Sequence, residues 1–300
     1  MTPPTSTSTT PADQLPGTLR ERYQLVQDSI AKAAARSGRK ASDILLVAVT
    51  KHAAPEQIRE MIDLGHRDFG ENRVQVLMQH AALAEEYQAR LRITPSARKQ
   101  HNTRGEALLF PEPTTTAPTI PSAADVPVRW HMIGHLQRNK ARKAMEYVRL
   151  VHSVDSLRLA EELQTIGLKR DQIIEVLIQV NIAGEDQKSG IPGPAVLPLC
   201  EQIDTMVHVR VRGLMTMAPY SDKPEDSRGV FARCRELFDD VQKAGVGEGR
   251  FNILSMGMSG DYQVAIEEGA NLVRVGTSLF GSGPANAEEN DDEAREAPEA

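Results

Sequence analysis

The chain has 300 residues, of which 40% are hydrophobic and 25% charged, with a formal net charge of −6 at pH 7. This length allows one large core or two smaller ones, and the negative charge gives no global positive field to attract nucleic acid. No apolar run reaches the roughly 18 residues of a membrane span. The N-terminus lacks a signal-peptide pattern. We therefore expect a soluble cytoplasmic protein without nucleic acid or membrane partners.

Three polar segments differ from the rest of the chain. Residues 1–16 are rich in Thr, Ser and Pro, and residues 284–300 are acidic. Both are too polar to offset the entropy cost of ordering, so we expect disordered tails. Residues 93–126 contain five prolines and a run of three threonines. We interpret them as a low-complexity surface insertion within one folded domain over residues 17–283, because the alternation of strands and helices resumes after them.

The clearest structural pattern lies in residues 44–72. Residues 44–49 form an apolar run that is too short for a helix and is rich in β-branched residues, which is typical of a strand buried on both faces. Pro55 then begins a predicted helix, and a second short strand follows. This β-α-β unit places Lys51 and Asn72 just beyond the carboxyl ends of two neighbouring strands.

A lysine at the end of a buried strand is unusual. Partial desolvation there would lower the pKa of the ammonium group and favour the neutral amine. A neutral amine is what a Schiff base with an aldehyde requires. The spacing leaves an alternative open, in which Lys51 is an ordinary lysine at the start of a helix.

The strand–helix alternation predicts the fold class. Eight strands are expected to start near residues 44, 66, 128, 148, 173, 208, 251 and 271. Helices are expected over residues 19–37, 55–64, 74–92, 137–147, 156–165, 195–206, 226–244 and 261–268, with Asp155 as the N-cap of the fifth. Eight parallel strands in roughly 240 residues indicate a single (β/α)8 TIM barrel of α/β class. An open doubly wound sheet is less favoured, because no G-x-G-x-x-G follows the first strand.

Small polar residues gather at the ends of the last two predicted strands. Ser255 and Ser259 lie at the end of the seventh strand, and Arg274, Gly276 and Thr277 at the end of the eighth. TIM barrels commonly bind phosphate there, through backbone N–H groups and a short helix. The lysine on one side of the barrel mouth and a phosphate site on the other suit pyridoxal phosphate (PLP), whose aldehyde bonds to lysine while the phosphate anchors the far end.

Some of these residues also have a plain structural explanation. Ser259 could cap the helix at residues 261–268, and Gly276 could be a turn glycine. His131 is more simply a satisfied core histidine than a ligand, and the basic residues 138–143 a solvated helix face. No spacing of Cys, His or Asp supports a metal site.

Seven segments together are specific to one family. They are VAVTKHAAP (47–55), DFGENRVQ (68–75), WHMIGHLQRNK (130–140), HSVDSLRLAEEL (152–163), QVNIAGEDQKSGI (179–191), VRGLMTM (211–217) and LSMGMSGDYQVAIEEGANLVRVGTSLFG (254–281). The chain resembles the pyridoxal phosphate homeostasis protein family, which consists of single-domain barrels similar to the N-terminal domain of bacterial alanine racemase.

The resemblance implies cofactor contacts for seven residues. They are Lys51 carrying the Schiff base, Asn72 near the ring, Ser255, Ser259, Gly276 and Thr277 at the phosphate, and Arg274 beside the phosphate or the ring nitrogen. Arg73 departs from the pattern, since the family often has tyrosine there.

A PLP site alone does not make an enzyme. Racemisation needs a second acid/base group facing the lysine, and no tyrosine lies at a predicted strand end to supply it. We therefore expect a monomeric PLP carrier without developed catalysis, which keeps free PLP low and passes it to PLP-dependent apoenzymes. Two alternatives stay open: an amino-acid racemase completed by another subunit, and a barrel that binds a different phosphorylated metabolite.

Overall fold

The computed structural model describes residues 17–102, 126–184 and 189–281. Both predicted tails and most of the predicted insertion lie outside these residues. Within the described ranges, no helix is both long enough and apolar enough to cross a lipid bilayer.

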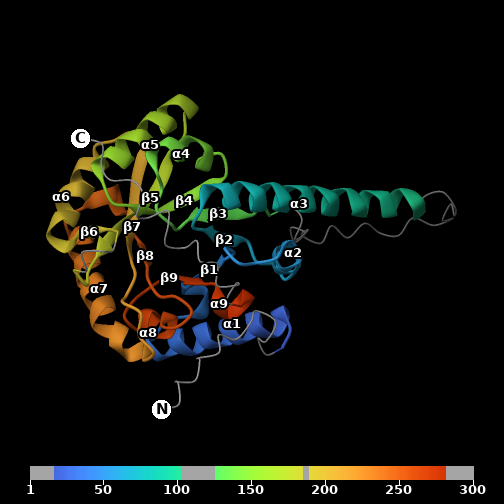
Figure 1. Ribbon diagram of the computed structural model, residues 1–300, viewed down its shortest axis with the longest axis horizontal. Coiled ribbons are helices and arrows are strands. Elements are labelled where there is room, and N and C mark those ends of the chain that lie inside the picture. The colour runs from blue at the N-terminus through green and yellow to red at the C-terminus, as the bar shows by residue number, and fades with distance from the viewer. Residues whose placement is uncertain (1–16, 103–125, 185–188, 282–300) are drawn as a thin grey trace, which may run out of the picture.

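Eight parallel strands close into a barrel, which confirms the predicted fold class (Figure 1). They are β1 (Leu45–Val49), β2 (Asp68–Glu71), β3 (Arg129–Met132), β4 (Val148–Val154), β5 (Ile174–Asn181), β7 (Val209–Thr216), β8 (Ile253–Ser255) and β9 (Leu272–Val275). The strand order is β4-β3-β2-β1-β9-β8-β7-β5, and pairing of β4 with β5 closes the cylinder. A two-residue strand, β6 (Ile191–Pro192), adds to β5 and was not predicted.

Helices connect the strands and surround the barrel. They are α1 (Leu19–Arg36), α2 (Pro55–Asp63), α3 (Val74–Asn102), α4 (Arg138–Ala144), α5 (Leu157–Arg170), α6 (Gly193–Asp204), α7 (Arg228–Lys243), α8 (Tyr262–Glu267) and α9 (Thr277–Phe280), with three 3-10 turns at Ala41–Asp43, Pro224–Ser227 and Val246–Gly249. The predicted helices are all present. The predicted cap of α5 is wrong, however, because Ser156 and not Asp155 is the N-cap and accepts the Leu159 N–H at 3.4 Å.

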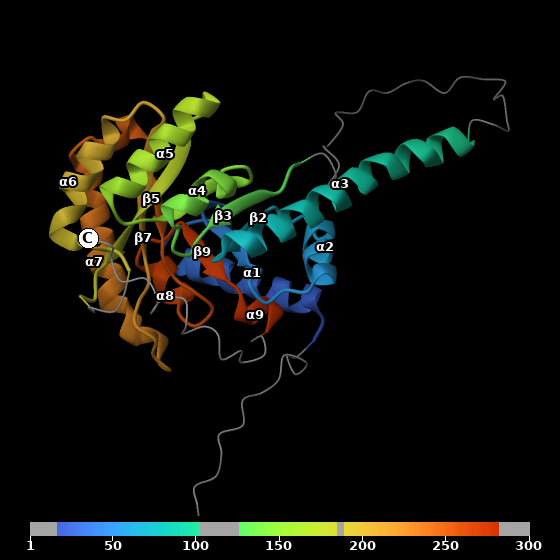
Figure 2. The same ribbon diagram turned by 45° about the horizontal axis from the view of Figure 1, so that its top comes forward.

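The largest difference from the sequence prediction concerns α3. This helix was expected to end at Arg92, but it continues to Asn102 and extends away from the barrel (Figure 2). Pro95 lies within the added stretch and removes one helical N–H. The residues that follow, at positions 97–100, are Ala, Arg, Lys and Gln, which are good helix formers. Their propensity is consistent with a helix that passes the proline.

The barrel separates two apolar cores. The large outer core lies between strands and helices and contains the buried Phe69, Phe231 and Phe251. The small inner core lies in the lumen; its buried members are Val47, Leu150, Leu177, Met215 and Leu272. Alternation of side chains along each strand produces this division. The lumen also holds buried polar side chains, which form part of the site described below.

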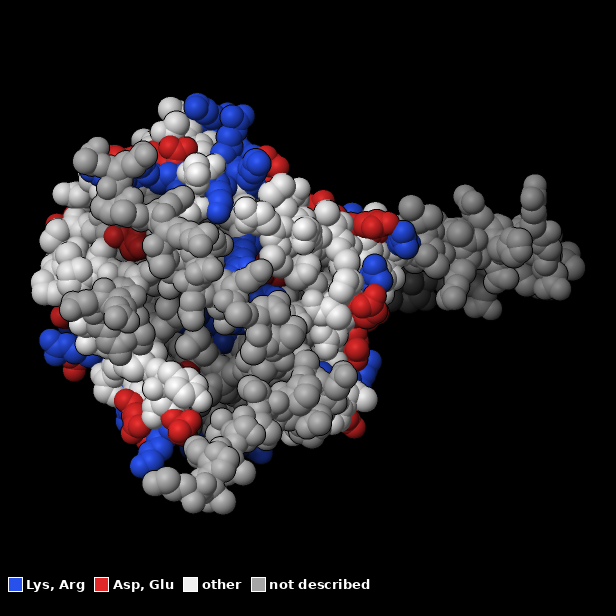
Figure 3. Space-filling model, viewed as in Figure 1, with Lys and Arg blue, Asp and Glu red and all other residues white. Residues whose placement is uncertain are grey.

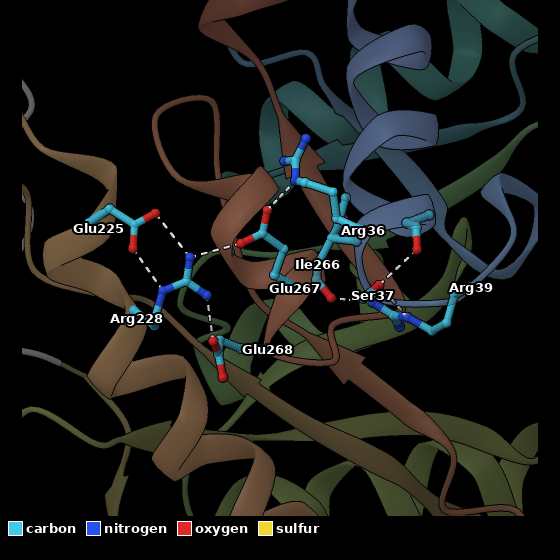
Figure 4. A network of polar contacts seen from close by, with 9 residues as sticks. Arg36, Ser37, Arg39, Glu225, Arg228, Ile266, Glu267 and Glu268 are labelled. Atoms are coloured by element: carbon cyan, nitrogen blue, oxygen red, sulfur yellow. Dashed lines mark hydrogen bonds and ion pairs between the residues drawn. The ribbon is translucent and has the colours of Figure 1, made fainter.

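An ion-pair network joins α1, α7 and α8 (Figure 4). The Arg228 guanidinium donates to Glu225, Glu267 and Glu268, and Arg36 donates to Glu267 at 2.6 Å. Arg39 donates to the backbone carbonyl groups of Ile266 in α8 and of Gly269 and Ala270 just after it. These contacts hold α8 against its neighbours, and the loop before α8 carries Ser259.

Candidate functional site

Lys51 and Asn72 lie side by side at the barrel mouth. Lys51 is in the turn after β1, Asn72 follows β2, and these two strands are parallel neighbours. Gly134, which follows β3, packs against Asn72 so closely that a Cβ atom would lie 2.3 Å from the Asn72 carbonyl oxygen. A side chain at Gly134 would therefore displace Asn72. The predicted placement of the lysine and the asparagine at neighbouring strand ends is confirmed.

Lys51 is exposed in this structure. The prediction that the strand end desolvates its ammonium group is wrong, because the lysine lies in the turn beyond the strand. Its side chain is consequently accessible to a ligand that enters the mouth.

Ser259 organises the loop at the end of β9. Its Oγ atom accepts hydrogen bonds from the Gly276 N–H at 3.2 Å and the Ser278 N–H at 3.4 Å. The alternative that Ser259 caps α8 is wrong, because Asp261 is the residue at the N-cap position. Since the Ser259 oxygen accepts both bonds, its hydroxyl proton remains available to an acceptor such as a phosphate oxygen. Thr277 begins α9 beside it and is exposed.

Arg274 lies in the lumen below this loop. Its side chain is 3% exposed, and it donates to Ser255 Oγ at 2.5 Å and to the Thr216 carbonyl oxygen at 3.0 Å. Burial above all lowers the pKa of the guanidinium to about 10, which leaves it charged at neutral pH. No carboxylate within the described ranges forms an ion pair with it. These two bonds use two of the five guanidinium N–H donors.

Ser255 and Ser259 have different surroundings. Ser255 is fully buried, and its Oγ atom contacts Arg274 and His152 Nδ1, the latter at 3.1 Å. Ser259 instead contacts the backbone N–H groups at the rim. The phosphate role predicted for Ser255 stays a prediction, and the structure adds a contact that holds Arg274.

Lys51 and the loop that carries Gly276 are neighbours around the barrel wall. Strand β9 pairs directly with β1, with Ala48 opposite Val275. A Cβ atom on Gly276 would lie 3.1 Å from the Val49 carbonyl oxygen, which shows how closely the loop approaches the end of β1. The expectation that Lys51 and the phosphate site face each other across the mouth is therefore wrong.

Two lumen residues were missed by the sequence analysis. His152 and Asp68 join the predicted core histidine His131 and Ser255 in one buried hydrogen-bonded series. A signal existed in β4, because His152 follows the lumen-facing Leu150 by two positions and so points to the same side. His131 is satisfied by hydrogen bonds, as expected of a core histidine.

Other candidate groups do not add to this site. The basic residues at positions 138–143 all lie on α4. Figure 3 shows lysine and arginine side chains gathered near α4 and α5. Within the described ranges, no group of three or more His, Cys, Asp or Glu side chains could hold a metal ion. Tyr220, on the loop after β7, is 93% exposed and donates to Asp222 rather than facing Lys51.

Sequence comparison finds close relatives over most of the chain. The family described as alanine racemase, N-terminal domain, matches residues 120–284. A pyridoxal phosphate homeostasis protein of Aquifex aeolicus is 37% identical over 265 residues, which cover 87% of this chain and 96% of the relative. The protein of the same name from Pseudomonas aeruginosa is 34% identical, with coverages of 88% and 96%.

Comparison with solved structures agrees. PipY of Synechococcus elongatus, in a structure with PLP bound, has a TM-score of 0.64 at 30% identity and is covered over 100% of its chain. Alanine racemase of Clostridium difficile has a TM-score of 0.57 at 14% identity, which shows the fold alone, and 57% of it is covered. The chain therefore belongs to the pyridoxal phosphate homeostasis protein family.

Proposed function

We propose that this protein is a PLP carrier that binds the cofactor at the barrel mouth. The observation that supports this most is the arrangement of Lys51 after β1 beside the Ser259–Gly276 contact on the adjacent strand β9. One group can form a covalent bond to an aldehyde, and the other presents donors suited to a phosphate. The name of the relatives and the PLP bound to PipY agree with this assignment.

The residues of the mouth fit such a ligand. The Ser259 hydroxyl and the exposed Thr277, at the first position of a helix, offer donors to an anionic phosphate. Arg274 is a buried cation that lacks an ion-pair partner among the described residues, as expected of a group that faces an acceptor on a ligand. We assign Arg274 to the ring side of the cofactor, because its side chain is fixed toward β7 and β8 and not toward the rim loop.

Each remaining group has a separate role in holding the cofactor. When bound, PLP supplies an aldehyde that bonds covalently to a lysine amine, here that of Lys51. Asn72 limits the space beside the lysine, and Gly134 fixes the Asn72 backbone by close contact. Ser255 keeps the Arg274 guanidinium in place, with a phosphate contact as its second proposed role.

The same geometry favours a carrier over a racemase. Two-base chemistry requires an acid/base group opposite the lysine, and the described tyrosines lie elsewhere: on α1, α3 and α8, in the turn after α4, and on the exposed loop after β7. We therefore propose no developed catalysis. Cytoplasmic location, a monomeric state and delivery to PLP-dependent apoenzymes belong to the same proposal.

One experiment tests the proposal against both alternatives. The purified full chain is mixed with PLP, reduced with borohydride, digested and mapped, and a second sample is incubated with L- or D-alanine. We expect visible absorbance that borohydride removes, a modified peptide containing Lys51, and no racemisation. Absence of colour would favour a barrel for another phosphorylated metabolite. Alanine turnover would instead establish a racemase.

A further inference from the structure

A series of four hydrogen bonds crosses the barrel lumen from β2 to β9. Asp68 Oδ1 lies 3.2 Å from His131 Nε2, and His131 Nδ1 lies 3.0 Å from His152 Nε2. His152 Nδ1 lies 3.1 Å from Ser255 Oγ, which accepts from Arg274 Nη1 at 2.5 Å. We call these five residues the lumen chain. All five are buried, with exposed fractions of 4% or less.

An ionised carboxylate at one end and two neutral imidazole rings determine the position of every proton in the lumen chain. Asp68 can only accept, so a neutral His131 carries its single proton on Nε2 and donates it to Asp68. His131 Nδ1 is then an acceptor, which places the proton of a neutral His152 on Nε2. His152 Nδ1 accepts in turn, so Ser255 donates its hydroxyl proton to that atom and accepts from Arg274, which can only donate.

Asp68 is held in that ionised form by its second partner. Arg129 at the start of β3 donates to both carboxylate oxygens, from Nε at 2.7 Å and from Nη2. Although burial acts to raise the pKa of Asp68, the hydrogen bonds from Arg129 and His131 hold it at about 2. Burial lowers the pKa of His152 well below its ordinary value, and the charge of Arg274 acts in the same direction. Both observations agree with a neutral imidazole at His152 and a charged carboxylate.

We propose that His131 and His152 are positioning residues that connect the cofactor-facing Arg274 to the buried carboxylate of Asp68 through a chain of fixed proton order. In a direct ion pair, a carboxylate would use the guanidinium N–H donors of Arg274. In the lumen chain, the hydrogen bonds between Asp68 and Arg274 all point the same way, and such aligned bonds strengthen one another in a low-dielectric interior. Arg274 thereby stays oriented while three of its N–H donors remain for a ligand in the mouth.

The proton order itself can be measured without any ligand. In the full chain with ¹⁵N-labelled histidine rings at pH 7, we expect both lumen histidines to be neutral with the proton on Nε2. A scalar coupling should be detectable across the N–H···N bond from His152 Nε2 to His131 Nδ1. A proton on Nδ1 of His152, or a charged ring at either position, would overturn the proposal.

A pair of isosteric substitutions tests the positioning role, which rests on the proposed function. In His152→Asn the amide oxygen takes the place of Nδ1 and can accept from Ser255, whereas His152→Leu has the same shape and no acceptor. We expect His152→Leu to retain PLP about tenfold more weakly, the scale of one lost hydrogen bond, and to shift the absorbance maximum of the bound cofactor. His152→Asn should stay within about twofold of the unmodified protein.

The outcomes separate this inference from the proposed function. His66→Phe is the matched control, because His66 is a buried histidine of the same barrel whose ring contacts Tyr23 and the backbone carbonyl group of Asp68 but no side chain of the lumen chain. It should leave PLP retention unchanged. Equal weakening in His152→Asn and His152→Leu would overturn the positioning role. If the unmodified chain fails to bind PLP, the proposed function fails, while the ring ¹⁵N spectra still decide the proton order.

Discussion

The rim and the lumen of this barrel use polar residues in opposite ways. At the rim, Lys51 and Thr277 are exposed and lie on short turns after β1 and β9. In the lumen, Arg274 and His152 are buried and are bonded to other side chains. Burial of polar groups requires such partners, whereas rim groups can exchange water for a ligand. The comparison agrees with the proposal that the rim residues bind the cofactor, while the lumen residues keep Arg274 in position.

The strongest test of the rim is removal of its amine. Lys51→Ala should abolish covalent retention of PLP completely, because it removes the amine to which the proposal assigns the covalent bond. The free energy of unfolding should change by less than about 0.5 kcal/mol, since the side chain is exposed. Absorbance, borohydride fixation and urea unfolding measure these effects. Lys143→Ala, at an exposed lysine on α4, is the control, and fixation that persists in Lys51→Ala would assign the covalent bond to another lysine.

Acid should lower the free energy of unfolding, and protonation of the buried His66 should account for a measurable part of that loss. Burial above all lowers the pKa of His66 to about 4. The unfolded chain takes up this proton near pH 6.5, so stability is lost as the pH falls from about 6.5 to about 4, by about 3 kcal/mol in full. In His66→Phe, the free energy of unfolding should therefore fall less over this pH range. Urea unfolding at pH 7 and at about pH 4.5 measures it. An equal loss in both proteins would contradict the account.

Substitution of Arg274 should weaken PLP binding without lowering the free energy of unfolding. Arg274→Met removes a buried cation without a carboxylate partner among the described residues, so the free energy of unfolding should change little or increase. PLP retention should weaken by about 2–3 kcal/mol, the scale of a hydrogen bond to a charged group. Denaturant unfolding and equilibrium dialysis measure the two quantities. A variant that unfolds easily but retains PLP normally would show that Arg274 serves the fold.

The smallest predicted effect concerns Thr277. Thr277→Ala should weaken PLP retention by about 1–2 kcal/mol through loss of one donor to a charged group. Stability should be unchanged, because the side chain is exposed. Thr165→Ala, at an exposed threonine on α5, is the matched control. Unchanged retention on dialysis would remove Thr277 from the phosphate site.

The sequence predicts the rim better than the lumen for a physical reason. Lys51, Asn72 and Thr277 lie just beyond strands, and strand ends can be recognised from local apolar runs and the residues that follow them. The lumen chain depends on side chains from β2, β3, β4, β8 and β9 that meet only after the barrel closes. His152 carries no local mark of its partners, although its spacing from Leu150 does indicate which way it points.

Two further differences concern the strand order and α3. The predicted closed barrel already implied that the last strand lies beside the first, but the sequence analysis placed the residues after the last strand on the side opposite Lys51. The length of α3 was underestimated because residues 93–126 were interpreted as a low-complexity insertion. Residues 97–100 favour a helix, and α3 continues past Pro95 although that proline lacks one N–H.

A crystal structure of the full chain with PLP tests the central claim most directly. The account predicts continuous density from Lys51 Nζ to the cofactor, with phosphate oxygens within hydrogen-bonding distance of Ser259 Oγ and the Thr277 N–H, and with Arg274 facing the ring. An unmodified Lys51, with the cofactor bound away from the β1 and β9 ends, would contradict it.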